Sequence, residues 1–112
     1  AGALFAITQP VWEPQVLLSF VARAREVGLP VIAGVWPLIS LRNAQFLNNE
    51  VPGIHIPEAV MARMAACRTR EEARAEGIAI AREFLAGIRH AVAGVQVSAP
   101  LGDVAMALEV LA

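Results

Sequence analysis

Residues 6–14 read AITQPVWEP, and this stretch joins the end of an apolar strand to the start of a helix. We predict the strand over Leu4 to Thr8, and Pro14 suits a first helical position, where no amide hydrogen is needed. Thr8 and Gln9 stand at the end of this strand, before the helix. Because ligands of parallel α/β proteins bind at the carboxyl ends of strands, this pair is a candidate site. The alternative is that both side chains only satisfy backbone groups of the loop.

Two further apolar runs, Val31 to Gly34 and Gly94 to Val97, read as strands in the same way. Continuous apolar runs are typical of parallel strands that helices cover on both faces. Helical spacing fills the intervals, so the order β-α-β-α-α-α-β-α predicts an α/β fold with right-handed crossovers. The helices are predicted from Pro14 to a stop at Gly28, over Leu41 to about Asn48, from Pro57 through Met64, over about Arg70 to Ala91, and over about Asp103 to Leu111.

Capping residues and apolar spacing predict how these helices begin and pack. Ser40 is placed to cap the helix that starts at Leu41, and Thr69 with Glu72 forms a T-x-x-E capping box for the longest helix. The first helix has the apolar residues Val16, Leu17, Phe20, Val21 and Ala24 at helical spacing, the longest has Ile78, Ala81, Leu85 and Ile88 as its inward stripe, and the last carries Val104, Leu108 and Leu111.

Length and composition indicate that the chain is one part of a larger fold. Its 112 residues have the size of one small domain, yet 57% are hydrophobic and 17% charged, which is more apolar than an average soluble domain. Three parallel strands leave two unpaired edges, whereas a closed (β/α) barrel needs eight strands and roughly 250 residues. We therefore expect residues 1–112 to be an incomplete piece of a larger α/β fold.

Charge and single residues disfavour several function classes. The net charge of −1 and the lack of a Lys/Arg cluster argue against nucleic acid and anionic membrane surfaces. No uncharged run is long enough to span a bilayer. The single cysteine, Cys67, favours a reducing cytoplasm and reads as a packing residue. His55 and His90 stand alone, so we expect no metal site.

The other two strand ends also carry polar or aromatic groups. Trp36 and Pro37 follow the second strand, and Gln96, Ser98 and Pro100 lie in or after the third. With the groups after the first strand, they suit recognition of a flat heterocycle by hydrogen bonding and stacking. Trp36 is equally well read as a rim residue, and Gln96 is favoured as structural because it lies inside its strand.

Five stretches of the sequence carry a resemblance to a known family. They are AGALFAITQPVWEP at 1–14, VIAGVWPLISLRNAQFLNN at 31–49, VPGIHIPEAVMARM at 51–64, EGIAIAREFLAGI at 76–88 and GVQVSAP at 94–100. In order and spacing they resemble the C-terminal part of methylenetetrahydrofolate reductase. The TQPV variant looks closest to the reductase half of bacterial bifunctional proteins that also carry a homocysteine S-methyltransferase domain.

This resemblance implies a fold and a reaction. The family is a TIM barrel that uses FAD to reduce 5,10-methylenetetrahydrofolate to 5-methyltetrahydrofolate with NAD(P)H. Residues 1–112 would then be its C-terminal segment and supply strands six to eight. The partners implied are the folate, NAD(P)H and the missing N-terminal part of the barrel, with a homo-oligomer also possible.

The resemblance also assigns residues. Gln9 matches the glutamine that hydrogen-bonds the pterin of the folate and alternately the nicotinamide. Ala3 and Ile7 match residues that contact FAD, and Thr8 is placed beside them as a cofactor-binding residue. Leu47 takes the position of a phenylalanine that packs on either ligand.

Leu47 departs from the family pattern at this position, and Phe46 is adjacent to it. The general-acid glutamate and the aspartate near the flavin belong to earlier strands of the barrel. No catalytic residue is therefore expected in this segment, and alone it should be inactive.

Two other readings remain open at this point. One is a different TIM-barrel enzyme that binds phosphate at the segment Ser40-Leu41-Arg42-Asn43, near a helix amino terminus. The other is a non-catalytic subunit that completes a barrel by docking through its sheet edges.

Overall fold

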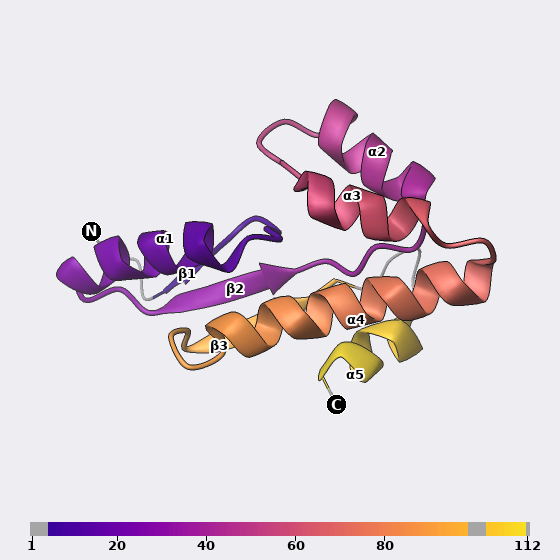
Figure 1. Ribbon diagram of the computed structural model, residues 1–112. Coiled ribbons are helices and arrows are strands. Elements are labelled where there is room, and N and C mark those ends of the chain that lie inside the picture. The colour runs from indigo at the N-terminus through magenta and orange to yellow at the C-terminus, as the bar shows by residue number, and fades with distance from the viewer. Residues whose placement is uncertain (1–4, 99–102, 112) are drawn as a thin grey trace.

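The computed structural model describes residues 5–98 and 103–111, and in these residues the predicted order of elements is confirmed (Figure 1). The strands form one parallel sheet in the order β1-β2-β3. The strands are β1 Ala6–Ile7, β2 Val31–Val35 and β3 Gly94–Val97, and the helices are α1 Pro14–Glu26, α2 Leu41–Glu50, α3 Glu58–Ala65, α4 Arg70–Ile88 and α5 Val104–Leu111.

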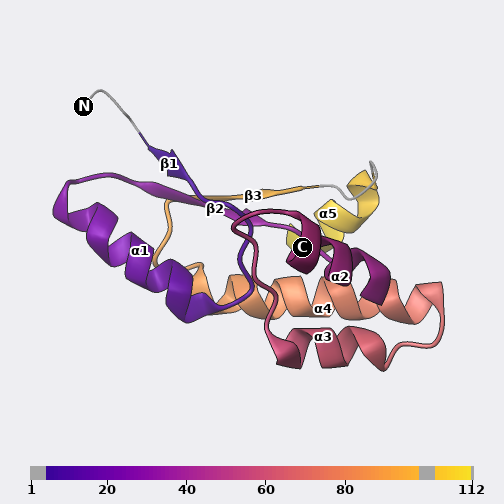
Figure 2. The same cartoon turned by 90° about the horizontal axis from the view of Figure 1, so that it is seen from above.

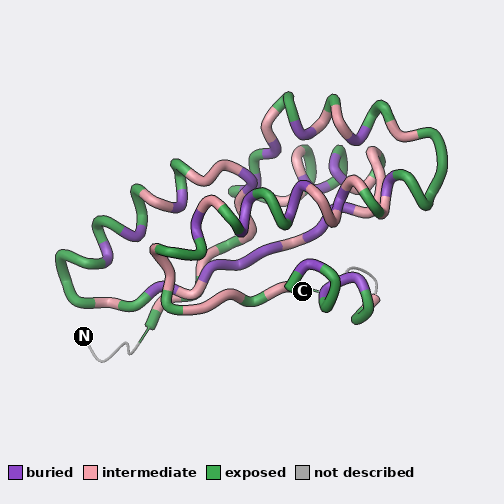
Figure 3. The backbone as a smooth tube through the Cα atoms, turned by 60° about the horizontal axis from the view of Figure 1, so that its bottom comes forward, coloured by how far each residue is buried: buried purple, intermediate pink, exposed green. Residues whose placement is uncertain are grey.

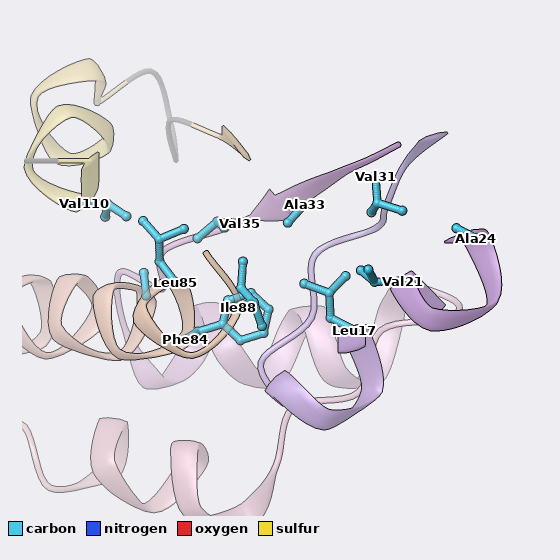
Figure 4. Close-up of a cluster of buried hydrophobic side chains, with 11 residues drawn as sticks. Leu17, Val21, Ala24, Val31, Ala33, Val35, Phe84, Leu85, Ile88 and Val110 are labelled. Atoms are coloured by element: carbon cyan, nitrogen blue, oxygen red, sulfur yellow. The ribbon is translucent and has the colours of Figure 1, made fainter. Parts of the chain in front are cut away.

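The first core cluster lies between one face of the sheet and the helices. Val31, Ala33 and Val35 of β2 point into it, and residues of α1, α4 and α5 meet them there (Figure 4). Figure 2 shows α1 and α4 on the same side of the strands. The helix residues of this cluster are Leu17, Val21, Ala24, Ala81, Phe84, Leu85, Ile88 and Val110.

No described helix covers the opposite face of the sheet. The register pairs Ile7 with Ile32 and Gly34 with Gln96, and side chains alternate along a strand, so these residues share the face away from the first cluster. Ile7 is 55% exposed there. Among the described residues, helices therefore pack on one face of the parallel strands only. Crossovers on one side only are the arrangement of a (β/α) barrel, whereas doubly wound sheets carry helices on both faces.

A second core cluster joins α2 and α3 to α4, beyond the carboxyl end of β2 (Figure 1). Leu38, Leu47 and Met64 are almost fully buried in it. Arg63 of α3 adds polar links to α4, because its guanidinium donates to Glu76 and, at 2.8 Å, to both carboxylate oxygens of Glu83. Since α4 also borders the first cluster, this helix connects the two halves of the core.

The predicted helix starts are confirmed by their hydrogen bonds. The Asn43 amide donates to Ser40 Oγ at 3.0 Å, and the Glu72 amide donates to Thr69 Oγ1 at 3.1 Å. Thr69 Oγ1 in turn donates to Glu72 Oε2 at 3.3 Å, and the Arg68 amide donates to Glu72 Oε1 at 3.5 Å, so Glu72 reaches back to the start of the helix. Gly28 ends α1 with φ +68°, a value that favours glycine.

Several apolar residues of α1 and α5 are exposed. Figure 3 colours the backbone by burial and shows exposed stretches along the helices. In α1 the expected stripe is only partly buried, because Val16 is 52% and Phe20 38% exposed. In α5 the buried residues are Met106, Ala107 and Val110, and the apolar residues singled out from the sequence lie outward. Both helices flank the outer strands, and no other described element covers their outer sides. The outward residues of α5 are Val104, Leu108 and Leu111.

Candidate functional site

Thr8 links the end of β1 to β2 by two hydrogen bonds. Its amide donates to the Ile32 carbonyl at 3.0 Å, and its Oγ1 accepts from the Gly34 amide at 3.0 Å. Gly34 permits this close approach, because a Cβ there would lie 2.5 Å from the Thr8 carbonyl oxygen. The hydroxyl of Thr8 therefore has a structural role, and its hydrogen remains available to a ligand.

Gln9 follows with an exposed side chain. Its carboxamide makes no hydrogen bond to the part of the chain that the structure describes. Other amides near the strand ends are in use: Asn43 Oδ1 accepts from the Ile39 amide, and Asn48 Oδ1 accepts from the Ile56 amide at 2.8 Å. Gln9 thus offers a free donor and a free acceptor at the carboxyl end of β1.

A hollow of about 380 Å³ at the outer side of β1 and α1 brings Ile7, Thr8 and Gln9 together. Its remaining wall includes Val16, Phe20 and the cationic side chain of Arg23. The surface is apolar with a few polar groups, and it lies along the edge of β1 that no described strand pairs with. Ala3 lies outside the described residues, so its position beside this hollow stays a prediction.

Leu47 does not belong to this surface. Its side chain is 1% exposed and packs in the second core cluster, because Ala44 and Leu47 form the inward stripe of α2. A ligand could reach it only if this cluster opened. Phe46, next in the chain, is 57% exposed. The structure therefore leaves the aromatic side chain, and not the leucine, available for contact.

The remaining strand-end residues divide into packed and exposed groups. Trp36 packs against the second cluster, and its indole Nε1 is buried without a partner among the described residues. Gln96 is exposed on the open face of the sheet, so it is not buried in a described core. Ser98 is also exposed, and its amide donates to the Val35 carbonyl at 2.9 Å. Pro100 lies outside the described residues.

A larger hollow, about 620 Å³, includes Ser40 and Arg42 of the segment considered for phosphate binding. Its lining includes Arg42, Arg70 and Arg74. These arginines belong to two different helices, and the fold brings them together. Arg74 is already paired, with Asp103 at 3.4 Å and with Glu109 at 2.8 Å. No sequence motif could have indicated this grouping, because the arginines belong to α2 and α4.

Metal and thiol chemistry have no support in the described residues. They contain no group of three or more His, Cys, Asp or Glu side chains that could hold a metal ion. Desolvation raises the pKa of the Cys67 thiol, and the carboxylates of Glu76 and Glu72 act in the same direction. A thiol with a raised pKa is a poor nucleophile, which agrees with a packing role. None of the described helices has the length and apolar character needed to cross a membrane.

Comparison with known proteins gives one finding that bears on this site. The chain has no match among curated proteins. The sequence model of the family described as methylenetetrahydrofolate reductase matches residues 1–98, which include all three strands, α1 to α4 and Gln9. Because this match covers most of the 112 residues, the chain belongs to the methylenetetrahydrofolate reductase family.

Proposed function

We propose that residues 1–112 form the last three βα units, strands six to eight, of a TIM-barrel enzyme that reduces 5,10-methylenetetrahydrofolate to 5-methyltetrahydrofolate with FAD and NAD(P)H. The family match supports the reaction class. The sheet order and the single helix layer support the barrel, because each crossover of a (β/α) barrel returns over its outer face. In this arrangement the open face of the sheet, with Ile7, Ile32 and Gln96, is the inside of the barrel.

The free carboxamide of Gln9 is the observation that carries the substrate assignment. A carboxamide donates and accepts at once, so it matches the amide edge of a pterin and equally the carboxamide of a nicotinamide. One side chain would then serve both half-reactions in turn. The position at a strand end, at the mouth of the barrel, agrees with where ligands bind in this architecture.

The end of β1 fits part of a flavin site. Ile7 offers an exposed apolar side chain, and Thr8 retains a hydroxyl hydrogen to donate. Ala3 is proposed as a third contact. The sequence has no glycine-rich phosphate loop, so we assign the ribityl and pyrophosphate contacts to other strands of the barrel. The chemistry that FAD supplies when bound is hydride transfer from the nicotinamide to the folate.

Neither alternative reading is favoured. A phosphate at the amino terminus of α2 would compete with bonds already made there, because Ser40 Oγ and Asn43 Oδ1 both accept from backbone amides. It would also leave the free Gln9 carboxamide unexplained. A non-catalytic subunit that completes a barrel would use the same sheet edges, but the family match points to the reductase itself.

The proposal is tested on the full-length protein from its natural gene. We expect it to retain flavin absorbance through gel filtration and to form 5-methyltetrahydrofolate from the methylene substrate and NADH or NADPH. A full-length protein that binds no FAD and forms no 5-methyl product when supplied with FAD and either nucleotide would overturn the proposal.

Residues 1–112 alone should not behave as a stable monomer. Exposed apolar side chains flank both sides of the sheet, and unpaired strand edges favour association. We expect self-association or aggregation in sedimentation, with a broad melt and no stoichiometric FAD. A monomer with a sharp cooperative melt would contradict this. The exposed residues are Phe5, Ile7, Val16, Phe20 and Val27 on one side and Val104, Leu108 and Leu111 on the other.

We also propose that Phe46, and not Leu47, makes the ligand contact from α2. In the full-length enzyme, Phe46→Ala should raise the KM for the folate roughly threefold to tenfold, which corresponds to about 0.7–1.4 kcal/mol. The free energy of unfolding should change by less than about 0.5 kcal/mol, because Phe46 is exposed. Gln45→Ala, at the preceding exposed position, is the control. If both variants have wild-type kinetics, Phe46 is not a ligand contact.

A further inference from the structure

The carboxamide of Gln9 lies against Gly53, a residue that is 44 positions further along the chain, in the loop between α2 and α3. A Cβ added to Gly53 would lie 2.9 Å from Gln9 Oε1 and 3.7 Å from both Cδ and Nε2. These three atoms are the nearest that such a Cβ would meet. Because glycine has no Cβ, the Gln9 carboxamide can occupy the space beside Gly53.

The loop around Gly53 is held in place and does not depend on Gln9. The Ile54 amide donates to the Val51 carbonyl at 3.3 Å, and Gly53 has φ +84°. With Pro52 as the second residue and glycine as the third, these features describe a type II turn. Ile54 and Ile56 are buried beyond the turn, and the Ile56 amide is held by Asn48 Oδ1.

We propose that Gly53 is a positioning residue for Gln9, an inference that rests on the proposed role of Gln9 in binding the pterin and the nicotinamide. The turn imposes two independent demands on this position. The positive φ favours glycine, and the carboxamide of Gln9 needs the volume that a side chain would fill. A fixed turn beside a flexible side chain limits the orientations that the carboxamide adopts.

The two demands predict different consequences. A Cβ at 2.9 Å from an oxygen is too close, so one group must move. The loop is held by its own hydrogen bonds, whereas the Gln9 carboxamide is the free end of a flexible side chain. The carboxamide is therefore the group that moves. An alanine at position 53 would therefore change the orientation of a ligand-binding group. This effect adds to the backbone strain that alanine has at any position of positive φ.

Gly28 provides a matched control, because the chain has a second glycine of positive φ with empty surroundings. It has φ +68°, and a Cβ there would meet no atom of the described residues within 4 Å. In the full-length enzyme, Gly53→Ala and Gly28→Ala should both lower the melting temperature to a similar, modest degree. Only Gly53→Ala should raise the KM for methylenetetrahydrofolate, by roughly threefold to tenfold. Equal kinetics for the two variants would overturn the inference.

A double-mutant cycle with Gln9→Ala tests whether Gly53 acts through Gln9. We expect Gly53→Ala to add no further loss of kcat/KM in the Gln9→Ala background. Full additivity would overturn the positioning role. The result also separates this inference from the proposed function: if Gln9→Ala alone leaves folate kinetics unchanged in an active enzyme, the role of Gln9 fails, whereas a Gln9 effect without a Gly53 effect refutes only the inference.

Discussion

Replacing Gly77 by alanine is expected to lower the free energy of unfolding of the full-length protein by about 3 kcal/mol or more, at or beyond the upper end of typical overpacking costs. Gly77 is buried in the middle of α4, where the helix crosses the loop that follows β2. A Cβ at this position would overlap the Leu38 carbonyl oxygen and lie 2.8 Å from the Leu38 carbonyl carbon. Both atoms are backbone, so no side chain can turn aside.

Helix propensity alone predicts that Gly77→Ala would raise the free energy of unfolding. Alanine inside a helix is favoured over glycine by about 1 kcal/mol. The clash outweighs this gain, because α4 must move away from the Leu38 loop and α4 contributes to both core clusters. A shift would loosen Ile80 in one cluster and Phe84 in the other at the same time.

Gly87→Ala in the same helix is the control for Gly77→Ala. Among the described residues, its Cβ would meet only the ring of Pro14, at 3.3 Å and 3.4 Å, and small adjustments relieve such contacts. We expect Gly87→Ala to be neutral or slightly stabilising in denaturant unfolding. A Gly77→Ala protein as stable as the Gly87→Ala protein would show that α4 is not packed directly on the Leu38 loop.

Replacing Gln9 by alanine should reduce kcat/KM for methylenetetrahydrofolate by roughly tenfold to a hundredfold in the full-length enzyme. The loss of about 1–3 kcal/mol is that of a hydrogen-bonding group whose ligand partners are left unmatched. Oxidation of NAD(P)H should slow as well, because the same carboxamide is proposed to serve both ligands. Steady-state assays of the two half-reactions measure these effects.

The folded protein should tolerate the loss of Gln9. Its side chain is exposed and makes no hydrogen bond to the described residues, so melting temperature and FAD content should change little. Gln9→Glu keeps the size but removes the donor, and we expect an intermediate loss. Gln15→Ala, an exposed glutamine of α1, controls for surface effects. A lower melting temperature with unchanged folate kinetics would instead assign Gln9 a structural role.

The local structure of this chain follows from its sequence. Ser40, Thr69 with Glu72, Pro14 and Gly28 act over a few residues, and each forms the cap, start or stop that its chemistry predicts. The order of strands and helices follows from apolar runs and helical spacing, which are also local. The family was equally available from the sequence, because its motifs stand in order along the chain.

Tertiary structure decided which side chains are available to a ligand. Spacing could not tell that Leu47 is buried and Phe46 exposed, or that Val104 and Leu108 lie outward in α5, because an apolar residue does not specify which neighbour covers it. Nor could it place Gly53 beside Gln9 or Gly77 on the Leu38 carbonyl, since these contacts join segments that are far apart in the chain. Burial and close approach depend on the packing of whole elements, and that information is not carried by any short stretch of sequence.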